Sequence, residues 1–242
     1  MPSFAVISDV HSNLEALYAV LNEIEKEHTS ALFFLGDAVG YGAEPNTCVE
    51  VINDVSEIIV AGNHDRGAVG LTDISHFNPY ARTAIDWTRD VLTDKNRDFL
   101  RTAPLTYESD DKDIFLVHGT PKDPERWFYL EGKEDAVKNF RFFGQKFCFV
   151  GHSHIPFIAE QSANGKTVLF HTLTEIRKDC RYIINIGSVG QPRDGNPDAC
   201  YVIMSSNVIE IKRVSYDILL TQKKMKDAGL PDSLITRLAE GR

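Results

Sequence analysis

The sequence predicts an α/β protein in which a largely parallel first sheet gathers one polar site. Short apolar runs alternate with helical patterns over the first part of the chain, and this alternation is typical of βαβ units. Five apolar runs also end directly in a fragment that contains Asp, Asn or His. Because a buried strand that ends in a polar side chain brings that side chain to the carboxyl edge of the sheet, the five fragments predict a single site.

The first part of the chain is expected to alternate strands and helices and then to depart from that rhythm. The expected strands are 4–8, 31–35, 57–61, 114–117 and 147–150. The expected helices are 14–24, 45–53, 79–91, 94–103 and 134–143, with Asn13 placed to cap the first of them. Segment 66–113 interrupts the alternation, and we interpret it as a small helical insert beside the site.

Closely spaced strands are expected after His154. Their ranges are 155–161, 166–171, 181–186, 199–205 and 208–214, with Asn164-Gly165 and Ser206-Asn207 as hairpin turns. Residues 216–242 are expected to form one or two closing helices. The length suits one domain, and we expect residues 1–242 to form it.

Composition limits the class of partner. The net charge of −9 argues against a nucleic-acid polymer as the main partner, because that partner calls for a basic stripe. No apolar run reaches the length of a membrane span, and the first residues lack the pattern of a signal peptide. The four cysteines show no metal-binding spacing and are interpreted as reduced thiols. We therefore expect a cytoplasmic protein that binds no membrane; a homo-oligomer remains open.

The five polar fragments have the composition of a metal site. They read Asp9-Val10-His11, Gly36-Asp37, Gly62-Asn63-His64-Asp65, His118-Gly119 and Gly151-His152-Ser153-His154. Residues two apart in an extended segment point the same way, so each Asp-x-His or His-x-His pair can face one site. Mixed oxygen and imidazole ligands suit divalent manganese, iron, cobalt, nickel or zinc. The number of ligands suggests two ions.

The ordered fragments resemble the calcineurin-like metallophosphoesterase superfamily, whose pattern is D-x-H, G-D, G-N-H-[DE], H and G-H-x-H. The resemblance covers residues 8 to about 195. Segment Gly187–Gly195, which reads Gly-Ser-Val-Gly-Gln-Pro-Arg-Asp-Gly, is similar to the small bacterial and archaeal branch. The resemblance implies a four-layer αββα sandwich and a hydrolase. In such an enzyme a metal-bridging hydroxide attacks small phosphodiesters or nucleotides, including nucleoside triphosphates and dinucleoside polyphosphates.

The resemblance also implies a role for each residue of the site. Asp9, His11, Asp37 and His154 would hold one metal ion. Asp37, Asn63, His118 and His152 would hold the other, with Asp37 shared, because a carboxylate has two oxygens. Manganese is the expected ion, with iron, zinc, cobalt or nickel as alternatives. His64 would protonate the leaving group or stabilise its charge. His28, His76 and His171 fall outside the pattern and are not expected to be ligands.

Three further features bear on the substrate. Protein phosphatases of this superfamily carry an aspartate three residues after the bridging one, where this chain has Gly40. What orients His64 is therefore open, and a serine/threonine phosphoprotein phosphatase is a weaker alternative, beside a catalytically silent binding scaffold. Arg193 is a candidate to grip a distal phosphate, or else an exposed residue of a structural loop. Trp127-Phe128-Tyr129 could stack a nucleobase, although core packing or a subunit contact is favoured. We expect the substrate pocket between the metals, the insert and the Arg193 loop.

Overall fold

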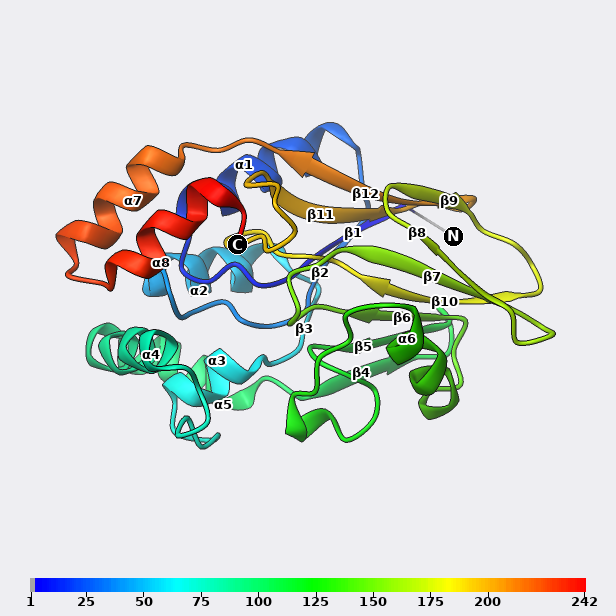
Figure 1. Cartoon of the computed structure of the whole chain (residues 1–242), viewed down its shortest axis with the longest axis horizontal. Coiled ribbons are helices and arrows are strands. Elements are labelled where there is room, and N and C mark those ends of the chain that lie inside the picture. The colour runs from blue at the N-terminus through cyan, green and yellow to red at the C-terminus, as the bar shows by residue number, and fades with distance from the viewer. Residues whose placement is uncertain (1–2) are drawn as a thin grey trace.

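Two six-stranded sheets pack face to face at the centre of the computed structural model, which describes residues 3–242 (Figure 1). The first sheet has the order β3-β2-β1-β11-β12-β9 and the second has the order β4-β5-β6-β10-β7-β8. The strands of the first sheet are β1 Phe4–Ile7, β2 Leu32–Phe34, β3 Ile58–Ile59, β9 Leu173–Glu175, β11 Ala199–Met204 and β12 Val208–Val214. Those of the second are β4 Thr106–Ser109, β5 Ile114–Val117, β6 Phe147–Val150, β7 Phe157–Ser162, β8 Thr167–Phe170 and β10 Cys180–Asn185.

Both sheets are mixed, and each has a parallel half. Strands β1, β2 and β3 are parallel to one another, as are β5, β6 and β10. The expectation of a largely parallel first sheet is therefore right for only half of it. Strands β11 and β12 are antiparallel, because a two-residue turn at Ser206-Asn207 reverses the chain. Strand β11 also pairs antiparallel with β1. The hairpin expected at Asn164-Gly165 joins β7 and β8.

The helices lie mainly outside the two sheets. They are α1 Leu14–Lys26, α2 Pro45–Val55, α3 Asn63–Ala68, α4 Pro79–Val91, α5 Asp94–Thr102, α6 Lys133–Asn139, α7 Ile218–Asp227 and α8 Asp232–Thr236. Short 3₁₀ turns are η1 Pro124–Arg126, η2 Phe140–Phe142 and η3 Arg237–Glu240. Asn13 caps α1 as expected, since its side-chain oxygen accepts a hydrogen bond from the Ala16 amide at 3.1 Å.

Alternation along the strands separates three layers of apolar packing. In β1, Phe4 and Val6 face the core between the sheets, whereas Ala5 and Ile7 face the helices on the outer side. In β5, Phe115 packs toward α6 on the outer side of the second sheet. Because both faces of the sheets are covered near their centre, the central strands β1, β5 and β6 are apolar throughout. The result is the αββα sandwich that the resemblance implies.

Three short elements were not predicted from the sequence. Strand β4 ends the segment interpreted as a helical insert, so residues 106–109 belong to the edge of the second sheet. It was missed because Thr-Tyr-Glu-Ser is half-exposed and shows no apolar run. Strand β9 is an equally short edge strand. Helix α3 begins inside the polar fragment itself, at Asn63.

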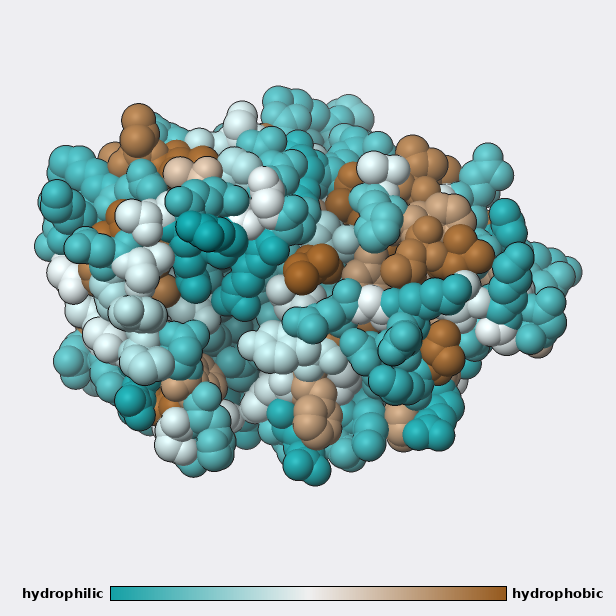
Figure 2. Space-filling view, viewed as in Figure 1, coloured by the Kyte–Doolittle hydropathy of each residue, from teal (hydrophilic) through white to brown (hydrophobic). Residues whose placement is uncertain are grey.

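The molecular surface is mostly hydrophilic in the view of Figure 2, with an apolar patch over the edge strands β8 and β9. Val168 and Leu173 are exposed there. Within residues 3–242, no helix combines the length and the apolar character that crossing a membrane requires.

Candidate metal centre

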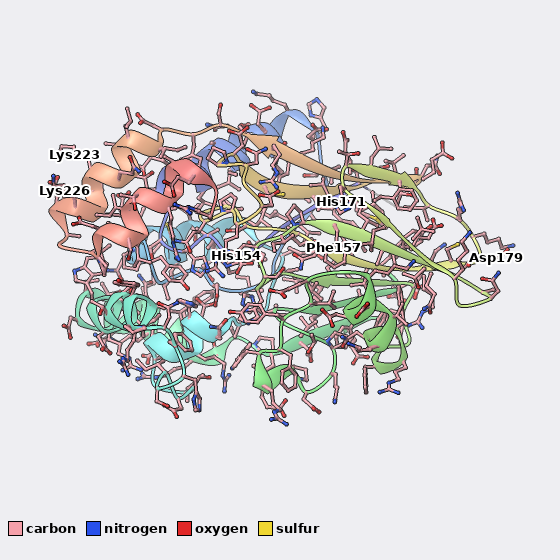
Figure 3. All side chains as sticks on the ribbon, in the orientation of Figure 1. His154, Phe157, His171, Asp179, Lys223 and Lys226 are labelled. Atoms are coloured by element: carbon pink, nitrogen blue, oxygen red, sulfur yellow. The ribbon has the colours of Figure 1, made fainter. Side chains whose placement is uncertain are left out.

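The eight polar side chains expected at the site come together where the parallel strands end. Asp9 and His11 follow β1, Asp37 follows β2, and Asn63 and His64 follow β3. From the second sheet, His118 follows β5, whereas His152 and His154 follow β6. All eight are buried, with at most 6% of any of them exposed. Figure 3 shows His154 near the middle of the molecule, well apart from His171, which lies outside this cluster.

The donor atoms form overlapping groups of three. Asp9 groups with His11 and His154, Asp37 groups with His118 and His152, and His64 groups with His11 and Asp37; within each group the atoms lie within 4.8 Å of one another. The distance from Asp9 Oδ1 to His154 Nε2 is 3.1 Å. The distance from Asp37 Oδ2 to His118 Nε2 is 3.2 Å. Two neighbouring groups can therefore each hold an ion.

Backbone carbonyls fix the orientation of four imidazole rings. His11 Nδ1 donates to Val39 O at 3.1 Å, His118 Nδ1 to Leu35 O at 2.7 Å and His154 Nδ1 to Gln191 O at 2.5 Å. His152 uses Nε2 instead, which donates to Trp127 O at 2.8 Å. A ring that donates one N–H in this way presents a lone pair on its other nitrogen, as metal-binding histidines do.

The inward-facing atoms are mostly acceptors, and this chemistry fits a cation. His11 Nε2 lies 3.1 Å from His154 Nε2, and His118 Nε2 lies 3.2 Å from Asn63 Oδ1. Asp9 Oδ1 is buried and has no hydrogen-bond partner. Lone pairs that face one another at this range repel unless a proton or a metal ion lies between them. The residues present therefore fit two divalent ions.

The charges around the carboxylates agree with that conclusion. Burial would raise the pKa of the Asp9 carboxyl, but His154 and His118 hold that pKa well below its usual range. Burial would likewise raise the pKa of the Asp37 carboxyl, but His118 and His64 lower that pKa below its usual range. Burial alone would lower the pKa of His118, but Asp37 and Asp9 raise it to about 9. Both aspartates are therefore ionised at neutral pH and His118 carries the proton that a metal would replace.

The backbone at this site is strained. Five of the candidate ligands have left-handed backbone, with φ of 56° at Asp9, 49° at His11, 58° at Asp37, 66° at His152 and 61° at His154. Non-glycine residues rarely adopt positive φ, and each instance costs on the order of 1–3 kcal/mol. Such outliers cluster at functional sites, where the surrounding structure determines them.

Asp65 supports the site and was not assigned a role from the sequence. Its Oδ2 accepts hydrogen bonds from the amides of Asp37 at 2.8 Å and Gly62 at 3.1 Å, and its Oδ1 accepts one from Val39 at 3.2 Å. Burial, reinforced by Asp37, raises the pKa of Asp65 to about 7. The one indication in the sequence that Asp65 belongs to the site is its position in the Gly62-Asn63-His64-Asp65 fragment. Asp65 fixes the backbone that carries Asp37 and makes no contact with the His64 ring.

The His64 ring is held by packing against other rings, and none of the described carboxylates forms a hydrogen bond with it. The His64 amide donates to Asp37 Oδ1 at 2.8 Å, while the ring lies 4.5 Å from the Tyr41 ring and 5.1 Å from the Phe77 ring, centre to centre. The ring Nδ1 is buried without a partner. A Cβ atom on Gly40 would lie 2.3 Å from that nitrogen, so any side chain at position 40 would displace the ring. Burial lowers the pKa of His64, which leaves it neutral at physiological pH.

A pocket of about 400 Å³ opens beside His64 and Asn63. On one side it is lined by the insert, and on the other side by the 126–129 loop; the residues are Tyr41, Thr72, Asp73, His76, Phe77, Asn78, Ala81, Arg126, Trp127, Tyr129 and His152. The Tyr129 ring stacks on His152 with the ring centres 4.2 Å apart. Arg193 contacts Tyr41, at the border of this pocket, through its Nη2 at 3.2 Å from the tyrosine hydroxyl.

The fold and the site are those of a metal-dependent phosphoesterase, which is a hydrolase. A family model described as the calcineurin-like phosphoesterase superfamily domain matches residues 3–207, and the chain belongs to this superfamily. Its members use a dinuclear divalent metal centre.

Individual relatives are similar over nearly the whole chain. The chain is 46% identical to an uncharacterized protein of Methanocaldococcus jannaschii, over 98% of each chain. It is 39% identical to a metallophosphoesterase from Sphaerobacter thermophilus of known crystal structure, with a TM-score of 0.88 and coverage of 100% of this chain and 99% of the other. The crystal structure of a hypothetical protein from Pyrococcus horikoshii has the same fold at 20% identity, with a TM-score of 0.83 and the same coverage.

Proposed function

We propose that this protein is a dinuclear metal-dependent phosphoesterase that hydrolyses small phosphodiesters or nucleotides. The observation that carries the proposal is the convergence of buried carboxylates and imidazoles, whose ligand atoms lie within 4.8 Å of one another in groups of three, beside an aromatic-walled pocket that Asn63, His64 and His152 line. A buried acceptor cluster needs positive charge, and a phosphate ester bound above two cations is the ligand that matches it.

The donor groups divide between two ions. Asp9, His11 and His154 would hold one of them, and His118, His152 and Asn63 the other. Asp37 would contribute to both, because its Oδ2 lies 3.2 Å from His118 Nε2 and 3.7 Å from His11 Nε2. Nitrogen and oxygen donors without thiolate suit manganese, iron, zinc, cobalt or nickel, and manganese is the ion that we propose. Bound divalent ions supply an activated water and neutralise charge on the phosphoryl oxygens.

His64 would act on the leaving group. Hydrolysis adds a water oxygen to phosphorus and breaks the bond from phosphorus to the leaving oxygen, which takes up a proton in place of the one that the attacking water gives up. His64 lines the pocket beside Asn63 and is therefore within reach of that oxygen. Because burial lowers its pKa, the ring is neutral and donates a hydrogen bond to the developing oxyanion better than it donates a full proton.

The pocket favours a small substrate over a protein. Its volume lies within the range of small-molecule sites, and the walls from Phe77, Trp127 and Tyr129 suit a planar base or aryl group. Nucleoside triphosphates and dinucleoside polyphosphates are included in this class. Gly40 argues against the phosphoprotein phosphatase alternative, since no aspartate can stand beside His64.

The remaining chain supports one domain in a reducing compartment. The closing residues 216–242 pack through Leu234 and Leu238 onto Tyr41 and α4, so we propose a single domain, with a helical insert that starts at about residue 66 and ends before β4. All four cysteines are buried free thiols, which supports our proposal of a cytoplasmic protein.

A substrate panel on metal-stripped protein refilled with manganese tests the function. We expect hydrolysis of bis(4-nitrophenyl) phosphate and of nucleotides, slower release from a phosphoserine peptide, and loss of all activity when the metal is stripped again. Asp9→Asn is the matched variant, because it keeps size and removes the charge of a candidate ligand. Metal uptake by the wild type without hydrolysis of any ester would establish a binding scaffold instead.

A further inference from the structure

Two arginines beside the candidate metal centre lack a carboxylate partner. Arg193 follows β10, and Arg237 begins η3 near the end of the chain. The Nη2 of Arg193 contacts Tyr41 Oη at 3.2 Å and Gln191 Oε1 at 3.3 Å, and Arg237 contacts the same Gln191 oxygen. Within residues 3–242, neither forms a salt bridge, whereas Arg213 and Arg242 each pair with an acid. The chain has a net charge of −9 and therefore an excess of acidic residues, so two neighbouring arginines without an acidic partner suggest that they bind an anionic ligand.

The fold itself places Arg237 in this position. Leu234 and Leu238, on either side of it, are buried in the apolar cluster that includes Tyr41. The amide of Gly195 donates to Gly241 O at 2.9 Å, which joins the end of the chain to the loop that carries Arg193. Figure 1 shows α8 and the C-terminus lying against that loop. The guanidinium of Arg237 therefore rests on a packed segment of the fold.

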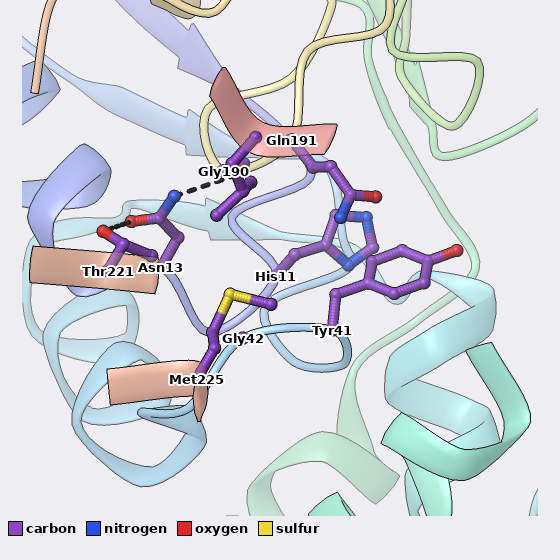
Figure 4. Close-up of a pocket in the computed structure, with 9 residues that line it drawn as sticks. His11, Asn13, Tyr41, Gly42, Gly190, Gln191, Thr221 and Met225 are labelled. Carbon is purple, nitrogen blue, oxygen red and sulfur yellow. Dashed lines mark hydrogen bonds between the residues drawn. The ribbon is translucent and has the colours of Figure 1, made fainter. Parts of the chain in front are cut away.

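The Tyr41 side chain lies between this pair of arginines and the histidines of the candidate metal centre. The guanidinium carbons of Arg237 and Arg193 lie 4.7 and 5.8 Å from the centre of the Tyr41 ring. That ring lies 4.6 Å from the His11 ring and 4.5 Å from the His64 ring. Figure 4 shows Gln191 and Tyr41 on the same side of His11.

The electrostatics of the pair call for an anion. A single amide oxygen, Gln191 Oε1, accepts from both guanidinium groups, and a neutral oxygen cannot offset two positive charges. The Nε atoms of both arginines are buried and have no hydrogen-bond partner among the residues that the structure describes. Planar guanidinium forks match phosphate oxygens in geometry and charge.

We propose that Arg193 and Arg237 together form a subsite for the phosphate group next to the scissile one. The preferred substrates then carry at least two linked phosphates, as nucleoside polyphosphates do. This inference rests on the proposed function, because the scissile phosphate must lie at the metal centre for the next one to reach the arginines. The closing segment of the chain thus selects the substrate class.

Binding to metal-free protein tests the subsite without activity. Inorganic tripolyphosphate is titrated calorimetrically into chelator-treated wild type, Arg193→Gln, Arg237→Gln, Arg237→Lys and the control Arg242→Gln. Arg242 comes from the same segment but is 74% exposed and paired with Glu240. Loss of one charged hydrogen bond weakens binding about ten- to a hundredfold. We expect that loss in both glutamine variants, an intermediate loss in Arg237→Lys, and none in the control.

Kinetics of the manganese-loaded enzyme provide the second arm. In Arg237→Gln, kcat/KM for ATP should fall about tenfold more than kcat/KM for bis(4-nitrophenyl) phosphate, which has one phosphate. Equal losses on both substrates, or binding of tripolyphosphate unchanged from wild type, overturn the inference. If Arg237→Gln has a lowered melting temperature, the comparison is made with Arg237→Lys instead, because lysine keeps the aliphatic part of the side chain and its positive charge. A wild type that hydrolyses only the aryl diester refutes the subsite alone, whereas one that hydrolyses neither ester with any metal refutes the proposed function.

Discussion

Gly40 offers the sharpest test of how the site is built. Its backbone has φ of 90°, and a Cβ atom there would lie 2.3 Å from His64 Nδ1 and 3.1 Å from His64 Cγ. The first distance is far inside van der Waals contact. In Gly40→Ala the His64 ring must therefore rotate or move away from the pocket, while the candidate ligands keep their places.

The expected effect combines two magnitudes. Forcing alanine into left-handed backbone costs roughly 1–2 kcal/mol of stability. Hydrogen-bond or proton donation to a leaving group contributes about 10²–10⁴-fold, so displacement of His64 should lower kcat by an amount within that range. The assay is manganese-loaded hydrolysis of bis(4-nitrophenyl) phosphate, with metal content measured on the same sample. We expect two metals per chain to be retained.

A control and a double mutant isolate the contact. Gly165→Ala has the same backbone problem, with φ of 83°, but a Cβ atom there meets nothing within 4 Å. It should lose similar stability and no activity. In the His64→Ala background, Gly40→Ala should change kcat by less than about twofold, because the contact is already gone. Full activity in Gly40→Ala, or an equal fall in both backgrounds, would refute the reasoning.

Three further predictions concern the metals. Asp37→Ala should lose at least one metal and nearly all activity; elemental analysis that finds both ions with full activity would show that Asp37 is not shared. His64→Ala should lower turnover about 10²–10⁴-fold with metal content intact, and loss of a metal from a folded mutant would make His64 a ligand. Metal binding near pH 7.5 should release about one proton from His118, whose pKa of about 9 leaves it protonated in metal-free protein. The release should fall as pH rises past 9; calorimetry in buffers of different ionisation enthalpy measures it, and His118→Asn is the control.

The candidate ligands could be predicted because each belongs to a short polar fragment that follows an apolar run. Asp9 follows Phe4–Ile7 and His118 follows Ile114–Val117, so strand position and ligand identity are both local in the sequence. Parallel pairing then brings the ends of the strands together. The sandwich itself came from the resemblance, since alternation within β1 alone does not say that a second sheet covers Phe4 and Val6.

The remaining features depend on contacts between distant parts of the chain. Arg237 meets Gln191 across 46 residues, and no periodicity in η3 indicates it. Edge strand β4 pairs on one side only, so it carries no apolar pattern. Asp65 was visible in the sequence but its task was not, because it supports the backbone of Asp37 and Val39 through hydrogen bonds that form only when the loops after β2 and β3 meet.

The left-handed backbone at the ligands links the fold to the chemistry. Such conformations at Asp9, His11 and Asp37 oppose folding locally, and hydrogen bonds between loops offset the cost. The amides of Asp9 and His11 donate to Gly36 O and Asp37 O at 2.9 Å, and the Gly190 amide donates to Asp9 O at 2.9 Å. These bonds hold the loops after β1, β2 and β10 to one another. The hydrogen bonds of the fold itself therefore help to hold the candidate ligands close together, in the arrangement that a bound cation would use.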